Sequence, residues 1–139
     1  MNTPHTDAYF EHERTVKLED LDELEHVNNA VYLSYVEDCA RAHAEAKGFT
    51  LENFKKHGVL PVVRRHEITY YAPATLGNTL TISTEVMKLG GPKATRRNRV
   101  KLKEDDSLLA EVVSDWVWLD PETNRPKRVP EELVTAFGF

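Results

Sequence analysis

A helical spacing of apolar side chains marks the stretch between residues 30 and 47. Apolar positions recur there every three or four residues, and Gly48, a residue that often ends helices, follows. Asn28 and Asn29 precede the stretch and suit a helix N-terminus, because a short side-chain oxygen can accept an unpaired N–H. We therefore expect one long helix over 30–47. Its apolar face carries Tyr32, Tyr35, Val36, Cys39, Ala42, His43 and Ala46.

The pattern changes to period-2 alternation after Gly58, with many β-branched and aromatic residues. Turn-forming residues such as Pro73, Gly77 and Gly90 separate the alternating segments. Strands are expected over 59–71, 79–89, 94–103 and 108–119, with a weaker first strand over 11–18. Short helices are expected over 51–57 and from Pro130 onward, and residues 1–10, which lack periodicity, are expected to form a flexible arm.

This order of elements predicts an α+β fold. Hairpin-length connections force the later strands to be antiparallel, and the long helix must bury its apolar stripe against the sheet they form. The simplest packing is a curved five-stranded antiparallel sheet wrapped around one long helix, which is the arrangement of the hot-dog fold. We expect residues 1–139 to form a single domain of this kind.

Composition narrows the functional classes. The net charge of −5 argues against nucleic acid as a partner, and no apolar run approaches the roughly 20 residues that span a membrane. Cys39 is the single cysteine, which fits a reducing compartment, and the N-terminus lacks the pattern of a secretory signal. A cytoplasmic location is expected. Neither a metal nor a redox cofactor is expected, because no metal-ligand spacing or Gly-rich phosphate loop is present.

A motif within residues 20–33 carries the clearest functional signal. It contains an Asp-x-Asp pair, Asp20 and Asp22, followed by His-Val-Asn-Asn and Tyr32. This segment resembles the signature of the 4-hydroxybenzoyl-CoA thioesterase family and is similar to the matching stretch of plant acyl-carrier-protein thioesterases. Segments 70–77 and 120–130 also resemble this family, so that the resemblance extends from about residue 15 to residue 133.

The resemblance implies hydrolysis of an acyl-CoA or acyl-carrier-protein thioester. By position, the catalytic carboxylate falls on Asp22, and the backbone N–H that polarises the carbonyl falls on Asn29. Glu25 stands where many members have Gly, and Leu24 replaces an Asn that the plant enzymes use.

The residues themselves are compatible with this chemistry. A helix N-terminus offers unpaired N–H groups for an oxyanion, and with Asn28 as the cap the N–H of Asn29 or Ala30 stays free. Asp22 would act on water as a general base, or attack the carbonyl to form a mixed anhydride.

The neighbouring polar and aromatic residues have alternative roles. Asp20 is expected to be a structural hydrogen-bond acceptor, and His26 either orients the loop or serves as a base. Cys39 is expected in the core. Tyr32 is expected in the core or lining an acyl pocket. Glu37 and Arg41, four residues apart on the helix, are expected to form an ion pair.

A cluster of basic residues lies between residues 88 and 103. An exposed sheet face is the simpler explanation of its alternating charges. The functional interpretation is that Arg96, Arg97 and Arg99 hold the phosphates of coenzyme A, since guanidinium groups bind phosphate with bidentate geometry.

Two other functions are compatible with a hot-dog domain. A non-catalytic acyl-CoA sensor needs an effector element, for which the predicted domain leaves no room. Hydratases of this fold pair Asp and His five residues apart in an Asn-Pro-containing stretch, whereas Asp22 and His26 are four apart with no Pro between them. Thioester hydrolysis is therefore favoured.

The predicted sheet leaves two unpaired edges, which invite pairing with a second copy of the chain. We expect a homodimer with the active site at the subunit boundary. The resemblance implies the same arrangement, often with dimers pairing again into tetramers.

Overall fold

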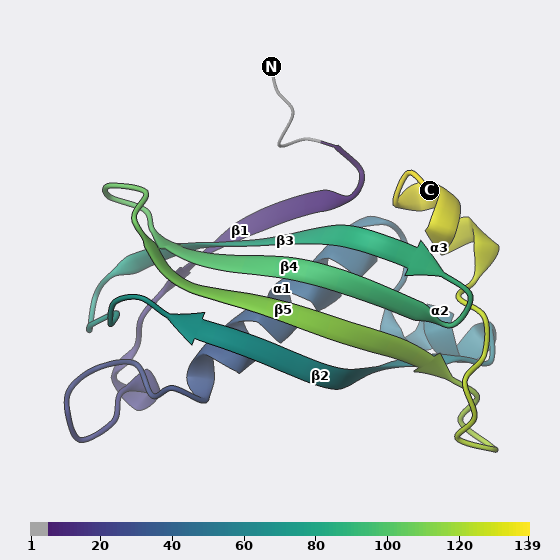
Figure 1. The fold of residues 1–139 in the computed structure, drawn as a ribbon, viewed down its shortest axis with the longest axis horizontal. Coiled ribbons are helices and arrows are strands. Elements are labelled where there is room, and N and C mark those ends of the chain that lie inside the picture. Colours follow the sequence, from purple (N-terminus) through teal and green to yellow (C-terminus); the bar gives the residue numbers. More distant parts are fainter. Residues whose placement is uncertain (1–5) are drawn as a thin grey trace.

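A five-stranded antiparallel sheet curves around a long helix in the computed structural model, which describes residues 6–139 (Figure 1). The spatial order of the strands is β1-β3-β4-β5-β2, so β1 and β2 form the two edges. The strands are β1 (Tyr9–Thr15), β2 (Leu60–Tyr70), β3 (Thr79–Gly90), β4 (Lys93–Leu102) and β5 (Leu108–Leu119). This architecture confirms the α+β, hot-dog arrangement expected from the sequence.

The helices lie close to their predicted positions. They are α1 (Val31–Ala46), α2 (Leu51–Lys56) and α3 (Glu131–Ala136), and a 3₁₀ turn η1 (Leu18–Asp20) precedes the loop that leads into α1. Helix α1 crosses one face of the sheet, while α2 and α3 lie together near one end of it (Figure 1). Among residues 6–139, no helix is both long and apolar enough to cross a membrane.

The first strand begins earlier than predicted. Tyr9 and Phe10 were expected in the flexible arm but pair with Glu85 and Thr84 of β3. Phe10 also stacks on His43 of α1, with ring centroids 5.4 Å apart. These tertiary contacts order residues 9 and 10, whose sequence alone is too short to show a strand pattern. The rest of the expected arm falls partly on residues 1–5, which lie outside the described residues.

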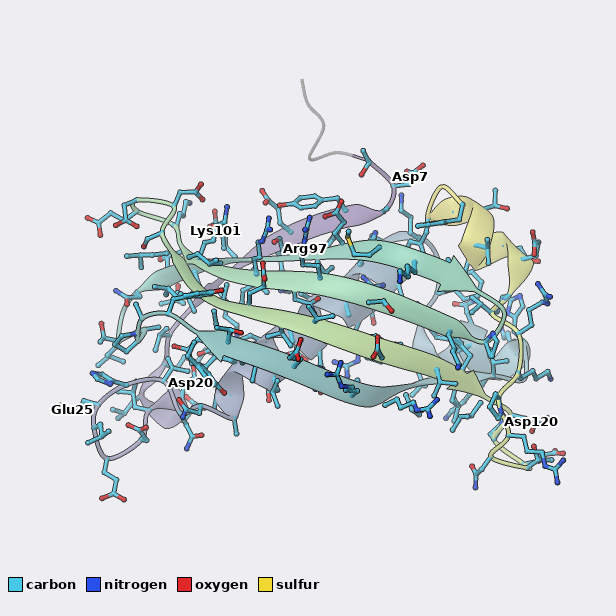
Figure 2. The ribbon with its side chains drawn as sticks, in the orientation of Figure 1. Asp7, Asp20, Glu25, Arg97, Lys101 and Asp120 are labelled. Carbon is cyan, nitrogen blue, oxygen red and sulfur yellow. The ribbon has the colours of Figure 1, made fainter. Side chains whose placement is uncertain are left out.

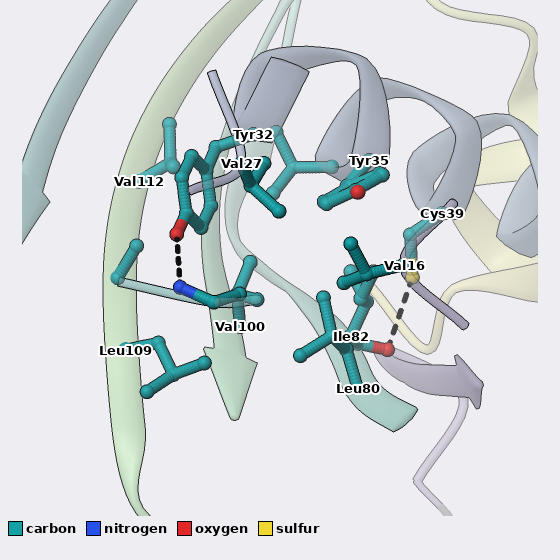
Figure 3. Close-up of a cluster of buried hydrophobic side chains, with 13 residues drawn as sticks. Val16, Val27, Tyr32, Tyr35, Cys39, Leu80, Ile82, Val100, Leu109 and Val112 are labelled. Atoms are coloured by element: carbon teal, nitrogen blue, oxygen red, sulfur yellow. Dashed lines mark hydrogen bonds between the residues drawn. The ribbon is translucent and has the colours of Figure 1, made fainter. Parts of the chain in front are cut away.

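The apolar stripe of α1 packs on the inner face of β3, β4 and β5 (Figure 3). Tyr35 and Cys39 are fully buried, and Leu80, Ile82 and Val100 face them from the strands. The Cys39 thiol donates a hydrogen bond to the carbonyl of Ile82, 3.4 Å away, and burial raises the pKa of this thiol to about 12. The thiol is therefore protonated at neutral pH, which confirms the core role expected for Cys39.

Strand alternation divides the basic cluster between the two faces of β4. Arg96 points inward and is only 5% exposed, whereas Arg97 and Arg99 lie on the outer face. The outer arginines pair with Glu85 and Glu111, each at 2.9 Å (Figure 2 labels Arg97). This separation follows from the period of two along a strand.

The predicted ion pair between Glu37 and Arg41 is wrong. Arg41 contacts Asp38 at 2.8 Å, and Asp38 also binds Arg14 of β1. Glu37 instead binds His66 of β2, with 2.9 Å between Oε2 and Nε2. Glu37 and Arg41 bind other residues because α1 presents Asp38 toward the β1 edge of the sheet and Glu37 toward the β2 edge.

Replacing Leu80 by Ala should lower the free energy of unfolding by about 2–5 kcal/mol, because a fully buried side chain would leave a cavity under α1. The matched control is Leu76→Ala, at a position 56% exposed, where we expect a change within about 0.5 kcal/mol. Urea denaturation followed by circular dichroism measures both. Equal losses in the two variants would contradict the packing described here.

Candidate active site

The loop between η1 and α1 folds back on itself before the helix begins. Leu21 and Val27 form an isolated antiparallel bridge, and the Asp22 N–H donates to the His26 carbonyl at 2.8 Å. Glu25, at the tip, has a φ of 63°, a left-handed conformation that glycine adopts most easily. The Val27 N–H donates to the Ala74 carbonyl at 2.9 Å, which ties the loop to the segment after β2.

Asp22 lies half-buried at the start of this hairpin-like turn. Its Oδ1 accepts hydrogen bonds from the Leu24 N–H at 2.9 Å and the His26 N–H at 3.4 Å. Its Oδ2 has no hydrogen-bond partner within residues 6–139. Asp22 and His26 both line a hollow of about 610 Å³, together with Leu24 and Leu76. One carboxylate oxygen is thus fixed by the loop, and the other is available to a ligand or water.

Asp20 has the structural role expected from the sequence. It is 9% exposed, and its Oδ2 accepts hydrogen bonds from the Lys17 N–H at 3.0 Å and the Tyr35 hydroxyl at 2.9 Å. Its backbone carbonyl accepts from the Asn28 N–H at 2.8 Å. Asp20 therefore connects the helix core to both ends of the loop (Figure 2 labels Asp20 and Glu25 in this region).

The N-terminus of α1 differs in detail from the expected cap. The helix begins at Val31, and the Asn28 side chain accepts a hydrogen bond from the Ala30 N–H at 2.9 Å. The Ala30 amide is therefore occupied, whereas the Asn29 N–H has no acceptor within residues 6–139. Of the two amides that the sequence left open, Asn29 is the one that remains free to bind an oxyanion.

Tyr70 is a neighbour of this amide that the sequence analysis did not select. Its hydroxyl donates to the Asn29 carbonyl at 2.7 Å, and its side chain is partly open at 41% exposure. The contact limits rotation of the backbone at Asn29. In the sequence, Tyr70 is only the first residue of the motif at 70–77. Its contact with Asn29 depends on how the end of β2 meets the start of α1, which the sequence does not specify.

Tyr32 belongs to the core. It is 2% exposed, and its hydroxyl accepts a hydrogen bond from the Ala74 N–H at 3.1 Å (Figure 3). Its ring meets Tyr70 edge to face, with centroids 5.4 Å apart. The structure therefore favours packing over the acyl-pocket alternative for Tyr32.

The phosphate role expected for Arg96 does not fit its position. Arg96 points inward, so it cannot join Arg97 and Arg99, on the outer face of β4, in one phosphate site. Arg97 and Arg99 are open on the outer face but already bind glutamates. Their contact with phosphate stays a prediction.

The structure also assembles Glu37, His66 and Ser114, which the sequence analysis did not connect. His66 lies between the other two, with Nε2 at 2.9 Å from Glu37 and Nδ1 at 2.7 Å from the Ser114 hydroxyl. Ser114 is 1% exposed and also accepts a hydrogen bond from Asn98. A serine buried in this way has no access to a substrate, so the group is a structural network. Within residues 6–139, no cluster of three or more His, Cys, Asp or Glu could hold a metal ion.

Replacing Asp20 by Ala should destabilise the protein far more than the same change at Asp22. Each buried donor left without its acceptor costs about 1–3 kcal/mol, and Asp20 serves both Lys17 and Tyr35. Asp22→Ala should cost at most about 1 kcal/mol, because the amides it binds are closer to solvent. Urea titrations of both variants test this order, and a reversed order would rule out the structural role of Asp20.

Known proteins resemble this chain over most of its length. The long-chain acyl-CoA thioesterase FadM of Escherichia coli (strain K12) is 28% identical over 113 residues, which is 81% of this chain and 85% of FadM. The acyl-CoA thioester hydrolase YbgC of Escherichia coli O6:H1 is 29% identical over 122 residues, which is 88% of this chain and 90% of YbgC.

Solved structures share the fold. A 1,4-dihydroxy-2-naphthoyl-CoA thioesterase from Synechocystis superimposes with a TM-score of 0.86 at 20% identity, covering 93% of this chain and 95% of the other. A Staphylococcus aureus protein solved in complex with CoA gives a TM-score of 0.87 at 18% identity, covering 97% of this chain and 85% of the other. The sequence profile of the thioesterase-like superfamily matches residues 16–137. With its hot-dog fold, the chain belongs to the thioesterase-like superfamily.

Proposed function

We propose that this protein hydrolyses an acyl-CoA thioester to a free acid and a thiol, with Asp22 as the catalytic carboxylate. The observation that carries the proposal is the state of Asp22: loop amides hold Oδ1, and Oδ2 is free beside a hollow. The names of the relatives FadM and YbgC support the reaction class. An acyl-carrier-protein thioester is the alternative substrate, since it presents the same bond.

The Asn29 N–H is proposed as the oxyanion donor. It stands just before a helix of 16 residues, whose dipole favours negative charge at that end. Tyr70 holds the carbonyl of the same residue, so the backbone there is restrained before substrate arrives. A donor fixed in advance stabilises the developing negative charge without reorganising during the reaction.

Asp22 can act in two ways, which lead to different intermediates. As a general base, it would take a proton from water while that water attacks the thioester carbonyl. As a nucleophile, Oδ2 would form a mixed anhydride and expel the thiolate, and water would then release the acid. A single turnover in ¹⁸O-labelled water separates these routes, because hydrolysis of the anhydride at its aspartyl carbonyl leaves label in Asp22.

His26 is proposed to position Asp22 through its backbone. The contact between them joins the His26 N–H to Oδ1 at 3.4 Å, and a change of side chain preserves that amide. His26→Ala should therefore reduce turnover less than any change that removes the carboxylate.

Asp22→Asn should lower kcat for acyl-CoA hydrolysis by at least ~100-fold, the scale of losing a positioned acid–base group. A free-thiol reagent with a panel of aromatic and aliphatic acyl-CoAs measures the rate. Asp20→Asn is the matched control. Near-normal turnover of Asp22→Asn would disprove the assignment, and a loss confined to Asp20→Asn would move it to that residue. Saturable binding without turnover by the unaltered protein would favour the sensor alternative.

We further propose a homodimer as the minimum unit, formed through the β2 edge. This strand of 11 residues is unpaired on one side and is longer than the other edge strand, β1, with 7. Antiparallel pairing of two β2 strands about a two-fold axis brings the Leu60 end of one subunit next to the Tyr70 end of its partner. Since Tyr70 contacts Asn29, each active site would then border the other subunit.

Sedimentation equilibrium at micromolar concentration should therefore show a mass of at least twice the chain mass of 15.9 kDa. A tetramer would also agree, because dimers of this fold class can pair again. As a disruptive variant, Ile68→Pro removes one backbone donor of β2, and thermal unfolding checks that the variant stays folded. A monomer that still hydrolyses acyl-CoA at the normal rate would overturn the shared site.

A further inference from the structure

A second cavity, of about 340 Å³, lies at the opposite end of α1 from the Asp22 loop. Its walls are mainly apolar and come from both helices and strands. Residues of α1, α2, β2, β4, β5 and α3 contribute, and the aromatic ones are Phe49, Phe54, Trp116, Trp118 and Phe137. No residue lining this cavity also lines the hollow beside Asp22. The volume is in the range of small-molecule sites, which are typically about 300–1,000 Å³.

Arg96 is the one charged side chain that reaches the wall of this cavity from the core. It is 5% exposed, and its Nη1 group donates to His43 Nδ1 and to Thr84 Oγ1, both at 3.0 Å. The remaining N–H groups, on Nε and Nη2, have no acceptor within residues 6–139. No Asp or Glu in that part of the chain forms an ion pair with Arg96.

His43 does not neutralise this charge. Burial, together with the charge of Arg96, lowers the pKa of His43 to about 4. The neutral ring accepts from Arg96 at Nδ1 and donates from Nε2 to the Asp7 carbonyl at 2.8 Å. Burial also lowers the pKa of Arg96 to about 10, which still leaves the guanidinium charged at neutral pH.

Trp118 adds a second donor without an acceptor. Its ring is 4% exposed and lines the cavity, and its Nε1 is buried with no hydrogen-bond partner among residues 6–139. Buried donors are normally paired, because leaving one without an acceptor costs free energy. The cavity therefore combines apolar walls with the guanidinium of Arg96, and no Asp or Glu of residues 6–139 lines it.

We propose that this cavity binds an amphipathic carboxylate, with its head group at Arg96 and its apolar body among the aromatic rings. The free fork of a guanidinium matches the two oxygens of a carboxylate. The exposed side chains of Arg41 and Leu51 border the cavity and mark its entrance.

Two sources could supply this chemistry. One is a free carboxylic acid, and the other is an acyl group on coenzyme A whose far end carries a second carboxylate. Only the second source rests on the proposed function, because the first needs no hydrolysis.

Intrinsic fluorescence reports occupancy of the cavity directly, because both tryptophans of the chain line it. Decanoate should change the emission saturably and bind at least ~10-fold more tightly than decanamide, a neutral ligand of equal length. Arg96→Met, which keeps an unbranched side chain but removes the charge, should abolish this preference. Arg125→Met is the matched control, since Arg125 is exposed in the segment after β5 and does not line the cavity.

Circular dichroism and thermal unfolding establish that Arg96→Met is folded. If it does not fold, Arg96→Lys replaces it: this change keeps the charge but removes the planar fork, so the preference for decanoate over decanamide is expected to fall. Equal affinity of the unaltered protein for decanoate and decanamide would overturn the proposal, as would a folded Arg96→Met variant that keeps the preference for decanoate.

Hydrolysis of decanoyl-CoA and decanedioyl-CoA distinguishes the two sources. A preference for decanedioyl-CoA that Arg96→Met removes would assign the cavity to the acyl group. Binding of free decanoate without that preference would assign it to a free acid. If neither ester is hydrolysed, the proposed function is contradicted. The fluorescence measurements then decide on their own whether the cavity binds a carboxylate.

Discussion

Burial of the apolar stripe of α1 against the curved sheet is the interaction on which the other features depend. Tyr35 and Cys39 are completely removed from water against Leu80, Ile82 and Val100, and burial of this kind is the main favourable term in folding. Because the helix is fixed along its length, its first residues are fixed too. The Asn29 amide therefore occupies a defined position before any substrate is present.

The loop before α1 is held by that core through Asp20 and Tyr35. This buried hydrogen bond of 2.9 Å joins the second turn of the helix to the start of the loop, and the Asp20 carbonyl holds the loop's other end at Asn28. Asp22, two residues further on, is thus placed by a neighbour that is itself inaccessible. The two carboxylates differ in burial: Asp20 is enclosed in the core, whereas Asp22 is half-buried and its Oδ2 has no hydrogen-bond partner within residues 6–139.

Polar groups beneath the helix form two separate arrangements. Glu37, His66 and Ser114 satisfy one another near the β2 edge, as buried polar groups normally do. Arg96 is different, because its charge has no carboxylate partner and its free N–H groups meet an aromatic cavity. The contrast between a satisfied network and an unsatisfied one is the physical reason to look for a ligand at Arg96 rather than at Ser114.

The sequence by itself determined the helix, the later strands, the α+β class and the family motif, since periodicity and turn residues are local properties. It also predicted a structural role for Asp20, which its hydrogen bonds to Lys17 and Tyr35 confirm. Only the tertiary structure placed Tyr9 and Phe10 in the sheet, Tyr70 on Asn29, and Arg96 inside rather than beside Arg97. Each of these depends on strand register or on contacts between distant segments, because a shift of one residue exchanges the faces of a strand.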